Sequence, residues 1–294
     1  MRVMSYNVNG FKGNKDSLIN MRENLDKIEA FIKDFLLGDI DNLVILQEVP
    51  LKDNAICYKK FIEKFKDYKF ICSYNVSVAN IITVAIANNK SKWVEKLDFY
   101  NRRESNDYLN RFIEVYNEEY KLQVLGLHIP CNKKDIIEIK KFWDEIISYK
   151  KSYSDIKSDK SDKSLMLVGD MNAEHYESSV STFKKELNDL SLDGKELIEG
   201  ATFKGKEKST NIDHMLIHKS NNSIEEYAKG SVMNSIDYSD HYPILSPPIK
   251  KITDRKLKKL YWLFLRVWYN IINKYEVYGT EILSSNLINS LEQI

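Results

Sequence analysis

The sequence predicts an α/β fold in which two packed sheets carry helices on their outer faces. Short runs of consecutive apolar residues, such as 43–46 and 165–168, are typical of strands that are covered on both faces. Two longer segments place their apolar residues at helical spacing instead. Strands separated by helices are followed by strands in close succession, and this order favours an α/β sandwich.

Each predicted strand or helix is indicated by the pattern of its apolar residues. Residues 3–6 form a short predicted strand, and residues 18–37 form a helix that ends at Gly38, a residue type that commonly ends helices. The apolar run 43–46 is the next strand. Residues 134–149 alternate charged and apolar residues and predict a second amphipathic helix. The remaining predicted strands are 68–71, 81–87, 111–116, 122–127, 165–168 and 212–217.

Composition limits the class of protein. Hydrophobic residues make up 43% of the 294 residues and charged residues 30%, as in an ordinary globular protein, and the net charge of +1 predicts no particular partner. The cysteines Cys57, Cys72 and Cys131 have neither a disulfide nor a zinc spacing. The apolar pattern that starts at Val3 leaves no room for a signal peptide, and no apolar run is long enough for a membrane span. We therefore expect a cytoplasmic protein.

Two segments differ from the rest in composition. Residues 148–164 are mostly Ser, Lys and Asp and predict a mobile surface loop. Pro247 and Pro248 end the strand pattern, so we predict a catalytic domain at 1–249 and a C-terminal extension at 250–294.

The extension combines positive charge with an apolar stripe at helical spacing. Such a stripe favours a helix that packs on the domain or on a second copy of the chain. The interleaved basic and aromatic residues would also suit contact with nucleic acid or an anionic membrane surface. The sequence leaves these alternatives open.

Polar residues end or interrupt several of the apolar runs. Carboxylates and amides that converge from separate strand ends would bind a hard divalent cation and a phosphate, which is what hydrolysis of a phosphodiester requires. The residues in question are Asn7, Asn9, Glu48, His128, Asp170, Asn172, Asp213, Asp240 and His241.

Each of these residues also has a structural interpretation. Glu48 directly follows a buried strand and is the best metal ligand, although a lone strand-end Glu is usually solvated. Asn7 and Asn9 could be turn residues. Asp170 and Asn172 could form an Asx turn, or could point the same way as a base and a donor to an oxyanion.

The histidines have similar alternatives. Asp213 lies in an apolar run and needs a partner, and His241 directly follows another Asp. A His held by a buried Asp has a fixed tautomer or stays charged. His128 ends a predicted strand and could simply cap it.

Six stretches in this order resemble motifs of the endonuclease/exonuclease/phosphatase superfamily, which has the DNase I-like fold. They lie between residues 4 and 244 and read MSYNVNG, LVILQEV, LGLHIP, LVGDMNA, NIDHMLI and SDHYPI. The resemblance implies a four-layered α/β sandwich and a requirement for Mg²⁺ or Mn²⁺. It also implies that Asn7, Glu48 and Asp240 contact the metal.

The resemblance implies roles for the other residues as well. Asp170 would position or deprotonate water, and Asn172 would contact the phosphate. His241, paired with Asp213, resembles the histidine that faces the phosphate. His128 matches the branch that includes DNase I, whereas abasic-site enzymes resembling exonuclease III usually carry an aromatic residue there.

The chain departs from the family pattern at two places. The histidine that corresponds to His128 in relatives resembling DNase I pairs with a Glu just before an upstream strand, and here Asn75 or Asn80 occupies that region. Arg111 begins a predicted strand, as a phosphate-binding Arg does in those relatives. Arg102 and Arg103 compete for the same role.

The main hypothesis is a Mg²⁺-dependent nuclease that hydrolyses DNA phosphodiesters. The alternative enzyme is a phosphatase or phosphodiesterase for a small molecule, a phosphoinositide or a lipid head group, because the same residues would serve it. A silent binding protein of the same fold would have no physical need for all of these residues together.

Overall fold

The structure is a computed structural model that describes residues 1–13, 18–51, 55–74, 79–155, 163–174, 182–205, 209–218 and 229–251. The predicted helix of the C-terminal extension and Asn75 lie outside these residues. No helix among the described ranges is long and apolar enough to span a bilayer.

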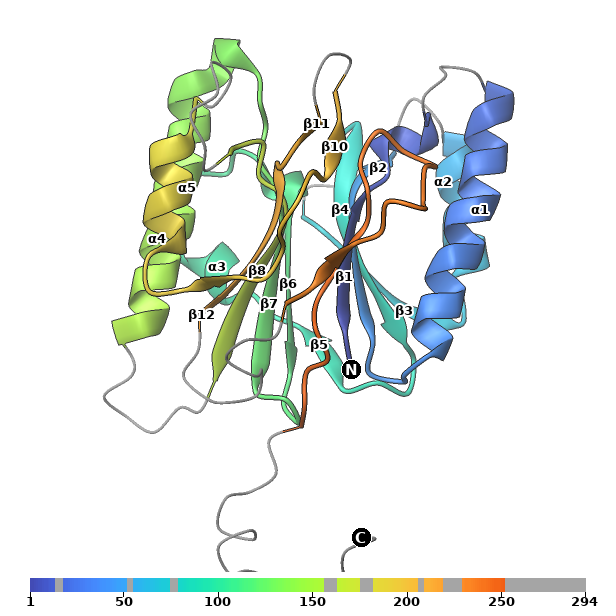
Figure 1. The fold of residues 1–294 in the computed structure, drawn as a ribbon, viewed down its shortest axis with the longest axis horizontal. Coiled ribbons are helices and arrows are strands. Elements are labelled where there is room, and N and C mark those ends of the chain that lie inside the picture. Colours follow the sequence, from blue (N-terminus) through green and yellow to red (C-terminus); the bar gives the residue numbers. More distant parts are fainter. Residues whose placement is uncertain are drawn as a thin grey trace, which may run out of the picture. The chain divides into compact units, whose positions relative to one another are not determined.

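Two six-stranded sheets form the centre of the described part of the chain (Figure 1). The first has the order β13-β14-β1-β2-β4-β3 and the second the order β5-β6-β7-β8-β12-β9. The strands of the first sheet are β1 Val3–Asn7, β2 Leu43–Pro50, β3 Tyr68–Cys72, β4 Ile81–Asn88, β13 Ser231–Val232 and β14 Ile244–Leu245. Those of the second are β5 Trp93–Glu95, β6 Phe112–Asn117, β7 Leu122–His128, β8 Ser164–Asp170, β9 Lys195–Glu196 and β12 Asp213–His218.

Helices cover the outer faces of both sheets, as the sequence predicts. In Figure 1, α1 and α2 lie beside the first sheet, and α4 and α5 beside the second. The helices are α1 Leu18–Leu37, α2 Ala55–Lys64, α3 Asp98–Arg102, α4 Ile136–Asp155 and α5 Lys184–Ser191. Short 3-10 turns are η1 Asn9–Phe11, η2 Leu109–Arg111 and η3 Lys133–Asp135, and a small hairpin joins β10 Phe203–Lys204 to β11 Ser209–Thr210.

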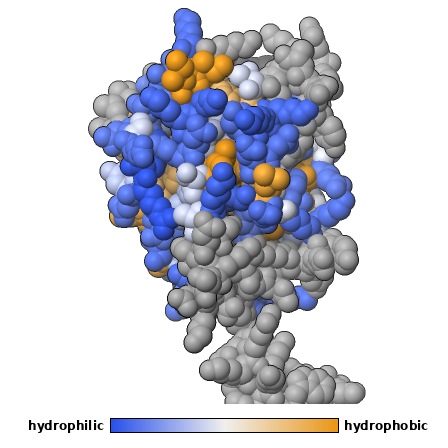
Figure 2. Space-filling model, turned by 90° about the vertical axis from the view of Figure 1, so that its left-hand side faces the viewer, coloured by the Kyte–Doolittle hydropathy of each residue, from blue (hydrophilic) through white to orange (hydrophobic). Residues whose placement is uncertain are grey.

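The layers are held together by apolar contacts between the sheets and beneath the helices. Ile45 of one sheet and Ile113 of the other belong to a single buried cluster. A side chain at Gly126 of β7 would meet Ile45 Cγ2 at 2.5 Å, so glycine lets the sheets approach closely there. Trp143 and Phe142 of α4 pack on the outer face of the second sheet, and the surface over α4 and α5 is mainly hydrophilic (Figure 2).

The predicted elements agree closely with these strands and helices, with one correction. Helix α1 has the predicted bounds 18–37, and strands at all the predicted places are present. The loop predicted at 148–164 is wrong at both ends, because α4 continues to Asp155 and β8 begins at Ser164. Tyr149 and Tyr153, four residues apart, pack their rings 6.4 Å from each other, which extends the apolar face of the helix beyond its predicted end.

The topology brings the ends of distant strands together. β1 runs parallel to β2, and β7 runs parallel to β8. Asn7 ends β1 and Asp170 ends β8, and the side chains of these two residues are hydrogen-bonded across the two sheets. The carboxyl ends of the central strands therefore meet at one rim, where α/β proteins commonly bind ligands.

Candidate active site

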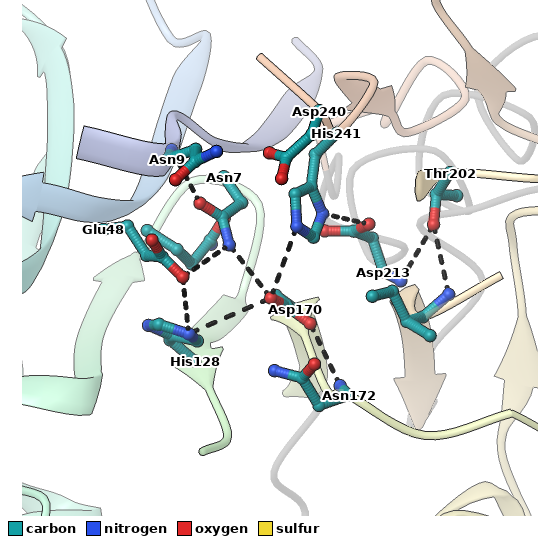
Figure 3. A network of polar contacts seen from close by, with 12 residues as sticks. Asn7, Asn9, Glu48, His128, Asp170, Asn172, Thr202, Asp213, Asp240 and His241 are labelled. Carbon is teal, nitrogen blue, oxygen red and sulfur yellow. Dashed lines mark hydrogen bonds and ion pairs between the residues drawn. The ribbon is translucent and has the colours of Figure 1, made fainter. Parts of the chain in front are cut away.

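A cavity of about 660 Å³ opens at this rim of the two sheets. The predicted residues that line it are Glu48, Arg111, His128, Asp170, Asn172, Asp240 and His241. Asn7 and Asp213 are hydrogen-bonded to residues of this set (Figure 3). The structure thus brings together the whole predicted set, although the elements that carry it are spread over most of the described chain.

A bulge in β2 turns Glu48 towards the cavity. The pairing of β2 with β4 shifts between Leu46 and Val49, and Glu48 between them has a φ of 56°, which is rare for a residue with a side chain. Glu48 therefore lies inside β2, and the prediction that it directly follows the strand is wrong. Burial raises the pKa of Glu48, but the hydrogen bond and the electrostatic attraction of His128, followed by the hydrogen bond from Asn7 and the charge of His241, lower it to about 2. The carboxylate is therefore ionised at neutral pH.

Asn7 joins the two carboxylates at the base of the cavity. Its Nδ2 donates to Asp170 Oδ2 at 2.9 Å and to Glu48 Oε1 at 3.3 Å, while its Oδ1 accepts the backbone N–H of Asn9 at 2.9 Å. This orientation presents the amide nitrogen to the carboxylates. A metal would need the amide oxygen, so direct ligation by Asn7 requires its amide to turn.

Asp170 lies at the centre of the arrangement and is 2% exposed. Its Oδ2 is 3.8 Å from His241 Nε2 and 3.9 Å from His128 Nε2, so an imidazole stands on either side (Figure 3). Burial raises the pKa of Asp170, and the nearby His241 opposes this only in part. A carboxylate with a raised pKa accepts protons more readily than an ordinary Asp.

Asp170 and Asn172 form the Asx turn that is one of the two interpretations of the sequence, and their catalytic roles stay predictions. Asp170 Oδ1 accepts the backbone N–H of Asn172 at 3.0 Å, which is an Asx turn. Asn172 has a φ of 48° and donates its Nδ2 to the carbonyl of Ile129 at 2.8 Å. Both side chains nevertheless line the cavity, because the turn redirects the chain at the rim.

His241 is held by Asp213, the partner that a buried carboxylate in β12 requires. The distance from His241 Nδ1 to Asp213 Oδ2 is 2.9 Å, and both residues are buried. Burial lowers the pKa of the imidazole, but Asp213, followed by Asp170 and Asp240, raises it to about 10. His241 is therefore an imidazolium at neutral pH and can bind an anion through Nε2.

His128 contacts different partners from those of His241. Its Nε2 is 3.3 Å from Glu48 Oε1, and Arg111 Nη1 lies 2.7 Å from its Nδ1. The same guanidinium nitrogen lies 3.1 Å from His128 Nε2, so Arg111 contacts both ring nitrogens. Among the described residues, the carboxylates within 4 Å of His128 are Glu48 and Asp170. Asn80 has an amide side chain and supplies no carboxylate.

The three candidate arginines have separate surroundings. Arg111, one residue before β6, lines the cavity. Arg103 has structural partners: its Nε is 2.8 Å from Glu145 and its guanidinium lies over the Phe142 ring at 4.8 Å. Arg102 lies over Tyr149. Arg111 is therefore the one of the three that reaches the cavity.

This difference predicts opposite effects of two substitutions. Arg111→Ala should lower kcat/KM about 10- to 100-fold with little change in stability, because a hydrogen bond to a charged group contributes about 1.5–3 kcal/mol. Arg103→Met should instead reduce the free energy of unfolding by about 3 kcal/mol, because it leaves Glu145 without its partner. Steady-state kinetics and urea unfolding of both variants would check this; a kinetic loss confined to Arg103→Met would contradict the assignment.

The donor set of the cavity fits a hard divalent cation. The described residues contain two groups whose possible ligand atoms lie within 4.8 Å of one another inside each group. The first group is Glu48, His128 and Asp170, and the second is Asp170, Asp213 and His241. Asp240 also lines the cavity. Carboxylate oxygens predominate, as Mg²⁺ and Mn²⁺ prefer.

Thr202 supports the site and has no motif that the sequence analysis could recognise. Its Oγ1 accepts the backbone N–H groups of Ile212 at 3.2 Å and Asp213 at 3.0 Å. Its carbonyl accepts the N–H of Tyr242 at 2.7 Å. Thr202 thus lies between the segments that carry Asp213 and His241, and only the folded chain reveals this.

No protein-family model and no curated protein matches the chain. Its fold is similar to that of a humanized D. rerio TDP2 with 14 mutations (12% identity, TM-score 0.55, covering 84% of this chain and 97% of that one). It is also similar to the 3′ phosphatase NExo from Neisseria bound to a product DNA hairpin (15%, 0.58, 84% and 98%). A further match is the 3′-5′ exonuclease NExo from Neisseria meningitidis (14%, 0.55, 85% and 100%).

These likenesses, at low identity, concern the fold. The chain shares the α/β sandwich fold of these structures, with two six-stranded sheets between outer helices, and the predicted fold class is confirmed. The roles of the individual site residues stay predictions.

Proposed function

We propose that the chain is a divalent-metal-dependent phosphodiesterase, and specifically a nuclease that hydrolyses DNA. The observation that carries this proposal is the buried Asp170 between two imidazoles, one of which is held as an imidazolium by Asp213. A base beside a fixed positive charge is what hydrolysis of a phosphate ester requires. The similar NExo structures, described as a 3′ phosphatase bound to DNA and a 3′-5′ exonuclease, support DNA as the substrate.

The charges of the cavity support a metal requirement. The carboxylates of Glu48, Asp170 and Asp240 surround a space whose fixed positive charges are Arg111 and His241. A phosphate diester would add a further negative charge, which this set would repel. A divalent cation, held by Glu48 with Asp240 and with Asn7 if its amide turns, would reverse that balance and act as a Lewis acid on the phosphate.

The chain's own residues would then perform the other steps. Asp170, whose pKa is raised by burial, accepts a proton from the attacking water. His241 donates a charged hydrogen bond to a phosphate oxygen through Nε2. Arg111 and the free N–H of the Asn172 amide contribute further donors, and His128 aligns Glu48 with Arg111.

Metal dependence is the most direct prediction. Activity should disappear in EDTA and return with Mg²⁺ or Mn²⁺. Glu48→Gln should weaken Mn²⁺ binding, measured by calorimetry, because it removes the ionised carboxylate. Glu138→Gln, a change on the surface of α4, provides the matched control and should bind Mn²⁺ as the wild type does. Full activity in chelator would refute the mechanism.

A substrate panel distinguishes the nuclease from the alternative enzyme. Plasmid, single-stranded DNA, abasic duplex, RNA, phosphoinositide and sphingomyelin would each be incubated with Mg²⁺ or with EDTA. Metal-dependent cleavage of DNA at the highest rate is expected. Faster cleavage of a phosphoinositide or a lipid head group would replace the nuclease proposal by a phosphatase or phosphodiesterase of the same fold, and no cleavage at all would favour a silent binding protein.

The C-terminal extension supplies a separate prediction about nucleic acid. We infer that it packs on the domain or on a second copy, so changing Lys256, Lys258 and Lys259 together to Gln should leave DNA affinity and stability nearly unchanged. A contact with DNA would instead show as weaker binding, with a salt dependence reduced by up to about 0.9 log–log units for each lost phosphate contact. Fluorescence anisotropy at several salt concentrations would separate the two results.

A further inference from the structure

A buried serine joins the two halves of the candidate site. Ser239 is 0% exposed and lies just before Asp240 and His241. Its hydroxyl donates to the backbone carbonyl of Asn7 at 2.8 Å, across 232 positions of sequence. Asn7 is the last residue of β1, and its side chain is the one that donates to both Glu48 and Asp170.

The hydrogen bond lies where the sheet itself provides no link. β14 pairs with β1 only at Met4 and Ser5, so the ladder ends before Asn7 is reached. Ser239 adds a side-chain contact beyond the last ladder pair. Without it, the turn that carries Asp240 and His241 would lose its direct hydrogen bond to the end of β1.

Ser239 also contacts both of the residues that follow it. Its Oγ is 3.2 Å from Asp240 Oδ1 and accepts the backbone N–H of His241 at 3.3 Å. Lys204 Nζ donates to the Ser239 carbonyl at 3.1 Å, which fixes the turn from the side of the β10–β11 hairpin. The serine is therefore held from several directions and has little freedom to shift.

We propose that Ser239 is a positioning residue that sets His241 and Asp240 against Asp170 and Glu48. It acts through Asn7: the backbone of Asn7 receives the serine hydroxyl, and the side chain of Asn7 orients the carboxylates. The inference rests on the proposed function for its kinetic consequences. Its structural consequences can be measured without any activity.

A second buried serine, which directly follows β14, provides the matched control. Ser246 Oγ accepts the N–H of Val3 at 2.9 Å and donates to the Pro247 carbonyl at 2.9 Å, and Ser246 is 2% exposed. It therefore makes comparable hydrogen bonds to β1, but at the opposite end from the cavity. Ser239→Ala and Ser246→Ala should show similar losses of thermal stability.

The kinetics of the two variants should differ. Ser239→Ala should lower kcat by up to about 100-fold while KM changes less, because small displacements of reacting groups can cost that much. Ser246→Ala should retain the wild-type kcat. Equal kcat losses in both variants, or an unchanged kcat in Ser239→Ala, would overturn the proposal.

A double variant tests whether Ser239 acts through His241. In the variant Ser239→Ala with His241→Ala the combined loss should be smaller than the product of the two single losses, because one of the groups that the serine positions is already missing. Independent, multiplying losses would contradict the proposal.

NMR of the His241 imidazole N–H that bonds Asp213 separates this inference from the proposed function. The resonance should be sharp in the wild type and in Ser246→Ala, but broadened or shifted in Ser239→Ala. If the wild type cleaves no substrate and this pattern is observed, the proposed function fails and the positioning role stands. An unchanged resonance in Ser239→Ala would overturn the positioning role.

Discussion

Replacing Asp170 by Asn is expected to reduce turnover by about 10²–10⁴-fold, the usual contribution of a general base. Asn is nearly identical in shape, but it cannot accept the proton of the attacking water. Asp170 accepts hydrogen bonds from Asn7 at Oδ2 and from the backbone of Asn172 at Oδ1, and the single amide oxygen of Asn can keep one of the two. Losing one hydrogen bond costs about 1 kcal/mol, so the fold should be retained. Steady-state kinetics with saturating Mg²⁺ would measure the loss.

The control for this experiment is Asp144→Asn on the exposed face of α4. It makes the same chemical change away from the cavity and should leave kcat unchanged. Circular dichroism would establish that both variants are folded. A folded Asp170→Asn protein that keeps nearly the wild-type rate would show that another group accepts the proton.

His241→Ala should have the second largest effect, because it removes the positive charge that Asp213 holds against the cavity. Since the pKa of His241 is raised to about 10, the imidazolium persists through neutral pH. On the alkaline side, wild-type activity should therefore fall only as the pH rises through about 10, and this alkaline decline should be missing from the residual activity of the variant. A rate profile that falls between pH 6 and 7 would contradict the Asp213 contact.

The same raised pKa has a consequence for stability. The folded state binds the His241 proton more tightly than the unfolded state, whose histidines titrate near pH 6.5. The contribution of this proton to stability is therefore complete below about pH 6.5 and is lost as the pH rises through about 10. The stability difference between wild type and His241→Ala should shrink over that interval, which urea unfolding at several pH values would show.

His128→Ala should cost less than His241→Ala. His128 contacts Glu48 and Arg111, whereas His241 is paired with the buried Asp213. We therefore expect His128 to align its neighbours and His241 to supply the fixed charge. An equal or greater loss from His128→Ala, in the same assay, would show that it donates a proton to the leaving group.

The sequence was sufficient to predict the elements whose signal is local. Helix α1 has the predicted bounds because its apolar residues recur at helical spacing and Gly38 follows. The strands around Leu43 and Leu165 were equally clear, since each is a continuous apolar run. The end of α4 was not predicted, because Tyr149 and Tyr153 lie in a polar segment and their burial against the sheet depends on tertiary packing.

The composition of the site was also predictable, but its internal connections were not. Glu48 has a positive φ inside a bulge, a conformation that no pattern of residue types indicates. The choice among Arg102, Arg103 and Arg111 depends on which guanidinium faces the cavity, and all three lie close together before the same strand. Thr202 and Ser239 act through backbone groups, which leave no trace in the spacing of functional side chains.

The pairing of β1 with β14 has a consequence for synthesis of the protein. Met4 of β1 pairs with Leu245 of β14. β1 leaves the ribosome early and can pair with β14 only after more than 200 further residues have been synthesised. Contacts this distant in sequence make folding slow compared with that of proteins built from local contacts. A chain interrupted before residue 241 would also lack His241. Under the proposed function, incomplete translation products would therefore lack both His241 and the pairing of β1 with β14, and full activity would arise only after nearly all of the sandwich has been made.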